Sequence, residues 1–113
     1  MSMLNHRYEG EVLVVHCQSK RIDDDVAIAL RVDMAALLEL GVSRIVLNLG
    51  NVEFIDSSGL GALISIIKRL GRDGTLVLCC VQNPVMSMFR MTRMDKVFHI
   101  TETEGQALLR SVA

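Results

Sequence analysis

Hydrophobic and polar positions along the chain predict a set of strands buried by helices. The segment Glu11–Gln18 is apolar at nearly every position, which is typical of a strand covered on both faces. Two further apolar runs, Arg44–Leu49 and Thr75–Val81, also predict buried strands, and Thr75–Val81 is expected in the interior of a sheet. A short last strand is predicted at Val97–Ile100.

Apolar residues at three- and four-residue spacing predict two amphipathic helices between these strands. The first is expected to begin at Asp23-Asp24-Asp25 and to end before Gly41, since carboxylates favour a helix N-terminus and glycine a C-terminus. The second is expected to follow Ser58 and to end at Gly71.

Capping signals predict two more helices in the last third of the chain. Asn83-Pro84 indicates a helix start with Asn83 as the cap. Thr101 and Glu104 have the spacing of a capping box and predict a terminal helix. Strands alternating with helices indicate an α/β fold, a mixed β-sheet with helices packed against it.

Composition limits the classes of function. The 113 residues suit one domain over residues 1–113, and the net charge of −1 gives no basis for nucleic-acid binding. No apolar run approaches the roughly 20 residues that span a bilayer, so direct membrane insertion is not expected. With no secretory signal visible and three cysteines lacking CxxC spacing, we expect a reducing, cytoplasmic setting.

The stretch Asp56-Ser57-Ser58-Gly59-Leu60-Gly61 stands out, because it lies between a predicted strand and a predicted helix. Short polar side chains there can cap the helix, and the glycines allow another group to approach closely. A helix N-terminus also accommodates an anion. The question is what a seryl hydroxyl displayed at this point does.

A serine nucleophile is poorly supported. A hydrolase elbow requires Gly-x-Ser-x-Gly, and neither serine has glycine two residues before it. The histidines that could activate a serine, His6, His16 and His99, show no linked pattern of base and orienting group. No catalytic residue is therefore assigned.

Cofactor and metal sites are equally weak. Gly59-Leu60-Gly61 begins a dinucleotide fingerprint, but Ile64 stands where its third glycine belongs. Cys79 and Cys80 are expected on opposite faces of a strand, where they could not hold one metal ion together. We expect neither a cofactor nor a metal.

Two clusters allow a structural or a binding interpretation. The methionines at positions 86, 88, 91 and 94 fit core packing with one exposed residue better than an adaptable contact surface. The aspartates from Asp23 to Asp25 can be caps and solvated groups, or part of a rim that binds a partner. For the serines, simple capping and acceptance of a phosphate at Ser58 remain open.

The residues resemble a known family. Asp56-Ser57-Ser58-Gly59-Leu60-Gly61, after the apolar run Ile45–Leu49, is similar to the signature of the STAS domain in bacterial anti-sigma factor antagonists. The likeness includes Ile22-Asp23, the Gly71–Gly74 turn, and Asn83-Pro84 with Phe89. One segment departs from it: Lys20-Arg21-Ile22-Asp23 replaces the usual Gly-x-Leu-Asp.

This resemblance implies a mechanism of partner switching. Ser58 would be phosphorylated, and Asp23, Asp56, Ser57, Ser58 and Gly59 would form the partner-binding surface. The unphosphorylated protein would bind an anti-sigma factor that is a serine kinase of histidine-kinase-like ATPase fold. Phosphorylation would weaken that binding, and a PP2C-type serine phosphatase would reset it. ATP and its metal would belong to the kinase.

Three alternatives stay open. The same switch could control an output other than a sigma factor, such as secretion or biofilm formation. The chain could instead be a structural STAS subunit of a membrane transporter, including a lipid transporter. A metabolic enzyme is a distant third.

Overall fold

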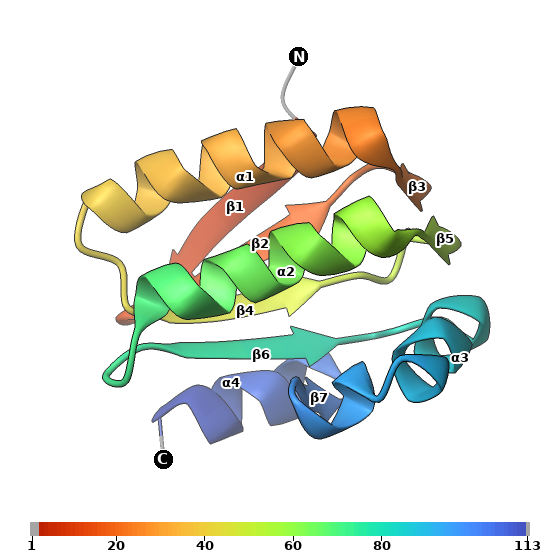
Figure 1. The fold of residues 1–113 in the computed structure, drawn as a ribbon. Coiled ribbons are helices and arrows are strands. Elements are labelled where there is room, and N and C mark those ends of the chain that lie inside the picture. Colours follow the sequence, from red (N-terminus) through yellow and green to blue (C-terminus); the bar gives the residue numbers. More distant parts are fainter. Residues whose placement is uncertain (1–2, 113) are drawn as a thin grey trace.

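The computed structural model describes residues 3–112, which form a mixed sheet with helices packed against it (Figure 1). The strands are β1 (Leu4–Glu9), β2 (Val12–Cys17), β3 (Arg21–Ile22), β4 (Arg44–Asn48), β5 (Phe54–Ile55), β6 (Thr75–Cys79) and β7 (His99–Thr101). The helices are α1 (Asp24–Glu39), α2 (Ser57–Leu70), α3 (Asn83–Met91) and α4 (Glu104–Val112), with a short 3₁₀-helix at Met94–Lys96. The predicted α/β fold is confirmed.

Five strands form the main sheet in the order β1-β2-β4-β6-β7. β1 is antiparallel to β2, whereas β2, β4, β6 and β7 run parallel to one another. Leu47 of β4 lies opposite Val15 of β2 and Leu78 of β6, so apolar side chains meet across the sheet. Since β6 pairs on both sides, the prediction of an interior strand at Thr75–Val81 is confirmed, although β6 ends at Cys79.

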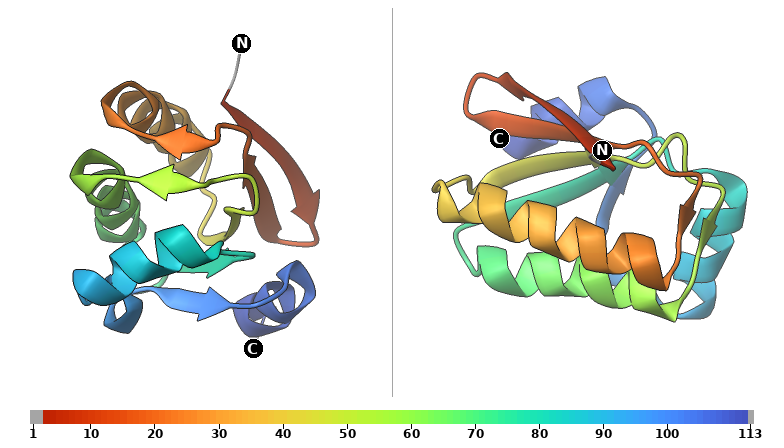
Figure 2. Two further views of the ribbon diagram at one scale, coloured as in Figure 1. Left: turned by 90° about the vertical axis from the view of Figure 1, so that its right-hand side faces the viewer. Right: turned by 90° about the horizontal axis from the view of Figure 1, so that it is seen from above.

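Helices cover both faces of the main sheet, with α1 and α2 on one side and α4 on the other (Figure 2). The larger core lies under α1, α2 and α3, and the smaller one under α4. Leu13 and Val15 of β2 enter the larger core, whereas Val12 and Val14 enter the smaller one. This explains the continuous apolar pattern of that strand and confirms that both of its faces are buried.

β3 and β5 form a separate two-stranded parallel sheet, in which Arg21 pairs with Phe54 and Ile22 with Ile55. β3 leads directly into α1, and β5 leads directly into α2. The two helices therefore begin side by side and run in the same direction (Figure 1). This small sheet fixes the relative position of the two helix N-termini.

The predicted cap of α3 is wrong in detail. Gln82, not Asn83, occupies the cap position, and it makes no capping hydrogen bond through its side chain. Pro84 lies in the first turn, as predicted, where its missing N–H has no helical partner to lose.

The capping box of α4 is also displaced from its predicted position. Thr103 Oγ1 accepts from the Gln106 N–H at 3.1 Å, and Gln106 Oε1 accepts from the Thr103 N–H at 3.2 Å. The box therefore joins Thr103 and Gln106 rather than Thr101 and Glu104. Glu104 is consequently free to interact with the main sheet.

The two edges of the main sheet match the sequence pattern least well. Only Leu4 of β1 is buried, so the pattern does not predict this strand. The last strand covers His99–Thr101 rather than Val97–Ile100, because the N–H groups of Val97 and Phe98 donate to the Met94 carbonyl in the preceding 3₁₀ turn. The Phe98 ring then packs against Phe89, with centroids 5.2 Å apart.

The prediction that Cys79 and Cys80 point to opposite faces is wrong. Cys80 has a φ of 61° and departs from strand geometry, so both cysteines pack in the smaller core. Burial and the adjacent Cys80 thiol raise the pKa of Cys79 to about 12.

The prediction that the methionines are core residues with one exposed is confirmed. Met91 is exposed, and Met86, Met88 and Met94 pack partly against the larger core.

Candidate functional site

The candidate site lies where α1 and α2 begin next to each other. Asp56 is the N-cap of α2, and its carboxylate accepts a hydrogen bond from the Gly59 N–H at 3.0 Å. Ser57 and Ser58 are the first two residues of the helix itself. The interpretation of the serines as caps is therefore wrong, because Asp56 takes that role.

The two serines differ in their surroundings. Ser57 is exposed, whereas Ser58 is half-buried. The Ser58 hydroxyl donates a hydrogen bond to the Asp24 carboxylate in the first turn of α1. Ser58 thus faces α1, and its hydroxyl already has an acceptor there.

The first turn of α1 surrounds this contact with negative charge. Asp23 is the N-cap of α1 and accepts from the Val26 N–H at 3.4 Å, which confirms its predicted position at the helix start. Asp24 and Asp25 are the next two residues. With Asp56, four carboxylates lie at the paired N-termini. No group of metal-ligating side chains suited to an ion occurs among residues 3–112.

Gly59 lies beneath the site rather than on its surface. It is buried, and a Cβ there would lie 2.5 Å from Ile55 Cγ1 and 2.7 Å from the Ile22 carbonyl oxygen. Any side chain would push α2 away from the small sheet. Gly59 therefore positions Ser57 and Ser58 through close packing and offers no side chain of its own.

The segment Lys20–Asp23, which departs from the resemblance noted in the sequence, is held by backbone hydrogen bonds. The Lys20 carbonyl accepts from the Glu53 N–H at 2.7 Å, which ties the start of β3 to β5. Lys20 needs no glycine-like geometry, since the non-glycine residues with positive φ among those described are Cys80 and Arg93. Lys20 therefore occupies this position without straining the turn.

An aromatic residue near the site was not apparent in the sequence. Phe54 is 37% exposed, and the Arg21 guanidinium lies over its ring at 4.2 Å from the centroid. Its position is set by the pairing of β3 with β5. The alternation in Phe54-Ile55, with Ile55 buried, is the signal that could have identified Phe54 as the outward residue.

The histidines of the described chain have partners other than the two serines. His16 lies 3.1 Å from a Glu104 carboxylate oxygen, and His99 lies 2.7 Å from an Arg110 nitrogen. In the described chain, no histidine hydrogen-bonds to Ser57 or Ser58.

The helices described include none with the length and apolar character needed to cross a bilayer.

Glu104 organises a polar cluster on the side of the sheet that faces α4. It contacts Arg7 and His16 and accepts from Asn48 Nδ2 at 2.9 Å. Burial opposes ionisation of Glu104, but the hydrogen bonds from Arg7 and Asn48 outweigh it, and its pKa lies below the ordinary value. The Asn48 Oδ1 atom accepts from Gly50, so the cluster also holds the connection that leads to β5.

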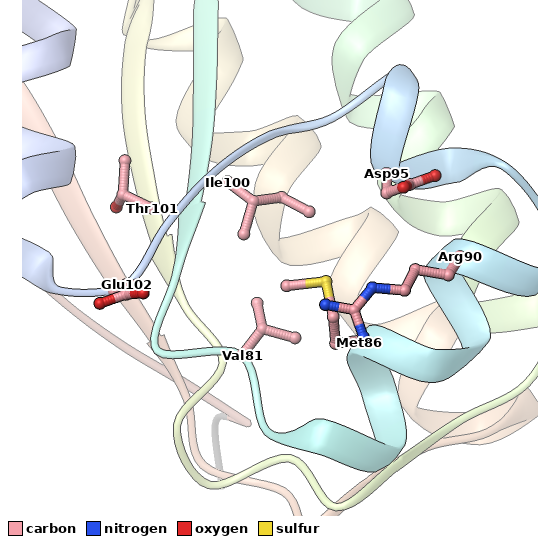
Figure 3. Close-up of a pocket in the computed structure, with 7 residues that line it drawn as sticks. All are labelled: Val81, Met86, Arg90, Asp95, Ile100, Thr101 and Glu102. Carbon is pink, nitrogen blue, oxygen red and sulfur yellow. The ribbon is translucent and has the colours of Figure 1, made fainter.

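A pocket of about 370 Å³ opens beside α3 and the end of β7 (Figure 3). Val81, Met86 and Ile100 form its apolar part, and Arg90 and Asp95 lie on its rim (Figure 3). It contains neither serine of the candidate site. The site at the paired helix N-termini therefore does not depend on this pocket.

Comparisons with known proteins match nearly the whole chain to one family. The STAS domain model matches residues 4–107. The anti-sigma F factor antagonist of Paenibacillus polymyxa is 32% identical over 110 residues, covering 96% of this chain and 91% of the relative. The crystal structure of an anti-sigma factor antagonist from Mycobacterium paratuberculosis is 25% identical with a TM-score of 0.89, covering 97% of this chain and 93% of that one.

The Bacillus cell fate determinant SpoIIAA shares the fold. Its unphosphorylated form has a TM-score of 0.71 at 20% identity, covering 95% of this chain and 96% of that one, and a phosphorylated form has also been solved. With the family model and the Paenibacillus relative both matching nearly the whole sequence, the chain belongs to the STAS domain family, among members of the anti-sigma factor antagonist type.

Proposed function

We propose that this protein is an anti-sigma factor antagonist that works in the cytoplasm by phosphorylation-controlled partner switching. Its unphosphorylated form binds an anti-sigma factor that is also a serine kinase of histidine-kinase-like ATPase fold. That kinase transfers phosphate from ATP to Ser58, and the modified protein binds it less tightly. A PP2C-type serine phosphatase removes the phosphate. The protein itself acts as a binding partner and substrate, not as an enzyme.

The hydrogen bond from Ser58 to Asp24 is the observation that carries this proposal. Phosphorylation replaces the hydroxyl donor with a group of roughly −1.5 to −2 charge. That group would face Asp24 and lie among the carboxylates of Asp23, Asp25 and Asp56. The local surface would change from a satisfied donor–acceptor pair to a concentrated negative charge, which a closely docked partner would have to accommodate.

The surface around Ser58 also offers exposed groups that a partner could contact. Ser57 is exposed and adjacent, and Phe54 with Arg21 presents an apolar and a basic group on the small sheet. We assign the partner-binding surface to Asp23, Asp56, Ser57 and Ser58, with Gly59 supporting them from below. The Paenibacillus relative, named for its action on anti-sigma F factor, supports an anti-sigma factor as the partner class.

The choice of Ser58 over Ser57 rests on orientation and on the family resemblance. Exposure alone would favour Ser57. Ser58, however, is the serine whose hydroxyl contacts α1, so its modification changes both helix N-termini at once. The unphosphorylated and phosphorylated forms of SpoIIAA support phosphorylation of a protein with this fold.

The test uses a candidate kinase, ATP and three variants of the full chain. After incubation, mass spectrometry should place phosphate on Ser58 in the wild type and in Ser57→Ala, and on no residue in Ser58→Ala. Calorimetry should show that Ser58→Asp binds the kinase at least tenfold more weakly than Ser58→Ala. Phosphate on another residue, or equal binding by Ser58→Asp and Ser58→Ala, would overturn the mechanism.

A further inference from the structure

We propose that Arg31 of α1 binds the phosphate of phosphorylated Ser58 at the surface where α1 and α2 meet. This inference deepens the proposed function and rests on it for the presence of the phosphate. Arg31 would act as a positioning residue for the modified serine, holding the phosphate beside the first turns of the two helices.

Arg31 already lies over α2, at the start of its second turn. Its Nη2 atom is 3.0 Å from the point that a Cβ on Gly61 would occupy. Gly61 is three residues after Ser58, and side chains at this spacing lie about 5–6 Å apart on one helix face. The guanidinium is therefore within about one helical turn of Ser58. The absence of a side chain at Gly61 is what lets it cross to α2.

The direction of the Arg31 side chain favours this contact. Asp24 and Arg31 are seven residues, or about two turns, apart, so they lie on the same face of α1. Asp24 contacts Ser58, which shows that this face looks toward the start of α2. Side chains on a helix tilt toward its N-terminus, and the N-termini of α1 and α2 lie together. These directions agree with an Arg31 side chain that crosses from α1 to α2 at Gly61, on the side of Ser58.

Electrostatic interactions favour a position of the phosphate near Arg31. Asp24 is an acceptor for the Ser58 hydroxyl, but it repels a phosphoryl group attached to the same oxygen. Arg31 is exposed and forms no ion pair with any residue from 3 to 112. Its planar fork of N–H donors matches phosphate oxygens in a bidentate arrangement. Rotation of the modified side chain away from Asp24 and toward Arg31 would replace a repulsion by an attraction.

This contact would have a consequence for the switch. The phosphate would lie against α1 and α2 instead of projecting freely into solvent, and so it would cover a fixed part of the surface beside Ser57. Arg31 would also offset part of the negative charge contributed by Asp23, Asp24, Asp25 and Asp56.

The experiment measures the ionisation of the phosphate in the full chain. Phosphoserine is installed at position 58 during synthesis by genetic encoding, and its second pKa, about 6 in a free phosphoserine, is followed by ³¹P NMR. Arg31→Gln should raise this pKa by roughly 0.2–0.7 units relative to the wild type, the range expected for one exposed ion pair. Arg31→Lys should give a smaller rise, because it keeps the charge and loses the fork.

Two further variants make the outcome decisive. Arg69→Gln removes an exposed arginine from the last turn of α2 and should leave the phosphate pKa at the wild-type value. Gly61→Ala places a methyl group where the guanidinium lies and should raise the pKa in the same direction as Arg31→Gln. Identical titration curves for wild type, Arg31→Gln and Arg69→Gln would overturn the inference. Because no kinase is used, failure of the partner-switching proposal would not affect this result.

Discussion

The hydroxyl of Ser58 donates a hydrogen bond to the carboxylate of Asp24, which is 34 residues earlier in the chain. This contact joins the first turns of α1 and α2 and connects the candidate phosphorylation site to the acidic cluster. It depends on the pairing of β3 with β5, which sets the two helix starts side by side. The contact is therefore both a structural link and the point at which a phosphate would act.

The Ser58–Asp24 pair should contribute measurably to stability. In urea unfolding, a double-mutant cycle with Ser58→Ala and Asp24→Ala should give a coupling energy of about 0.5–1 kcal/mol, since the pair is charge-assisted but partly solvated. Ser57→Ala, which removes an exposed hydroxyl, should change stability by less than about 0.5 kcal/mol. A coupling energy indistinguishable from zero would show that the contact does not persist in solution.

Gly59→Ala should destabilise the fold because a Cβ at that position would overlap Ile55 and the Ile22 carbonyl. We expect a loss of at least about 1–3 kcal/mol in the free energy of unfolding. Gly105→Ala is the matched control, since its Cβ would meet only Thr103 Oγ1 at 4.0 Å. That change, within α4, should stabilise the protein by up to about 1 kcal/mol. Equal stability of the two variants would contradict the close packing described for Gly59.

The capping role of Asp56 should be kept only by a side chain that can also accept a hydrogen bond from the Gly59 N–H. Asp56→Ala removes the bond to the Gly59 N–H and should cost about 0.5–2 kcal/mol. Asp56→Asn keeps an acceptor oxygen, so it should lower the free energy of unfolding by only a few tenths of a kcal/mol. Thermal unfolding followed by circular dichroism measures both. A fully stable Asp56→Ala would mean that α2 does not need this cap.

Protonation of Glu104 should account for part of the loss of folding stability at low pH. Its pKa is lower in the folded protein than in the unfolded chain, because the bonds from Arg7 and Asn48 outweigh the opposing effect of burial. The ionised group therefore contributes stability above the unfolded-state pKa, near 4.5, and this contribution is lost as pH falls through the folded-state value. Glu104→Gln should be less stable at neutral pH and show a shallower decline below it.

That pH dependence can be measured by urea unfolding between pH 7 and pH 3. Glu102→Gln serves as the control, since Glu102 is exposed and should leave the slope of the wild type unchanged. Parallel curves for wild type and Glu104→Gln would contradict the proposed contribution.

The cysteines should differ sharply between folded and unfolded protein in their reaction with a thiol reagent. Burial and the neighbouring Cys80 thiol raise the pKa of Cys79 to about 12, and burial raises the pKa of Cys17. At pH 8 only about one Cys79 side chain in ten thousand would be the reactive thiolate. Iodoacetamide labelling with peptide mapping should find both residues protected in native protein and modified in urea. Rapid native labelling of Cys79 would contradict its burial.

Much of the fold could be predicted from the sequence because the interior elements have strong local patterns. The strand around Val12–Cys17 is apolar on both faces, and Gly71, with a φ of 69°, ends α2 as predicted. The weaker predictions fall at edges and helix starts. The exposed strand β1 has no buried alternation, and Thr103 with Gln106 takes the capping box that the pattern assigns to Thr101 and Glu104.

The candidate site was located by its motif, but its internal geometry was not. The sequence indicated Ser58 at a helix N-terminus and could not separate a cap from a phosphate acceptor by chemistry alone. Only the structure shows that Asp56 is the cap and that Ser58 contacts Asp24. It also shows that Gly59 is buried and that Phe54 and Arg21 are neighbours.

The sequence by itself determined the interior strands β2, β4 and β6, the four helices, and the short motif that begins α2, because these depend on residues close together in the chain. The tertiary structure decided which helix starts meet. The two-residue strands β3 and β5 are too short to give a reliable local signal, and their pairing depends on contacts between segments more than 30 residues apart. That pairing brings Asp24 to Ser58 and Arg31 to Gly61, and so creates the surface on which the proposed switch would act.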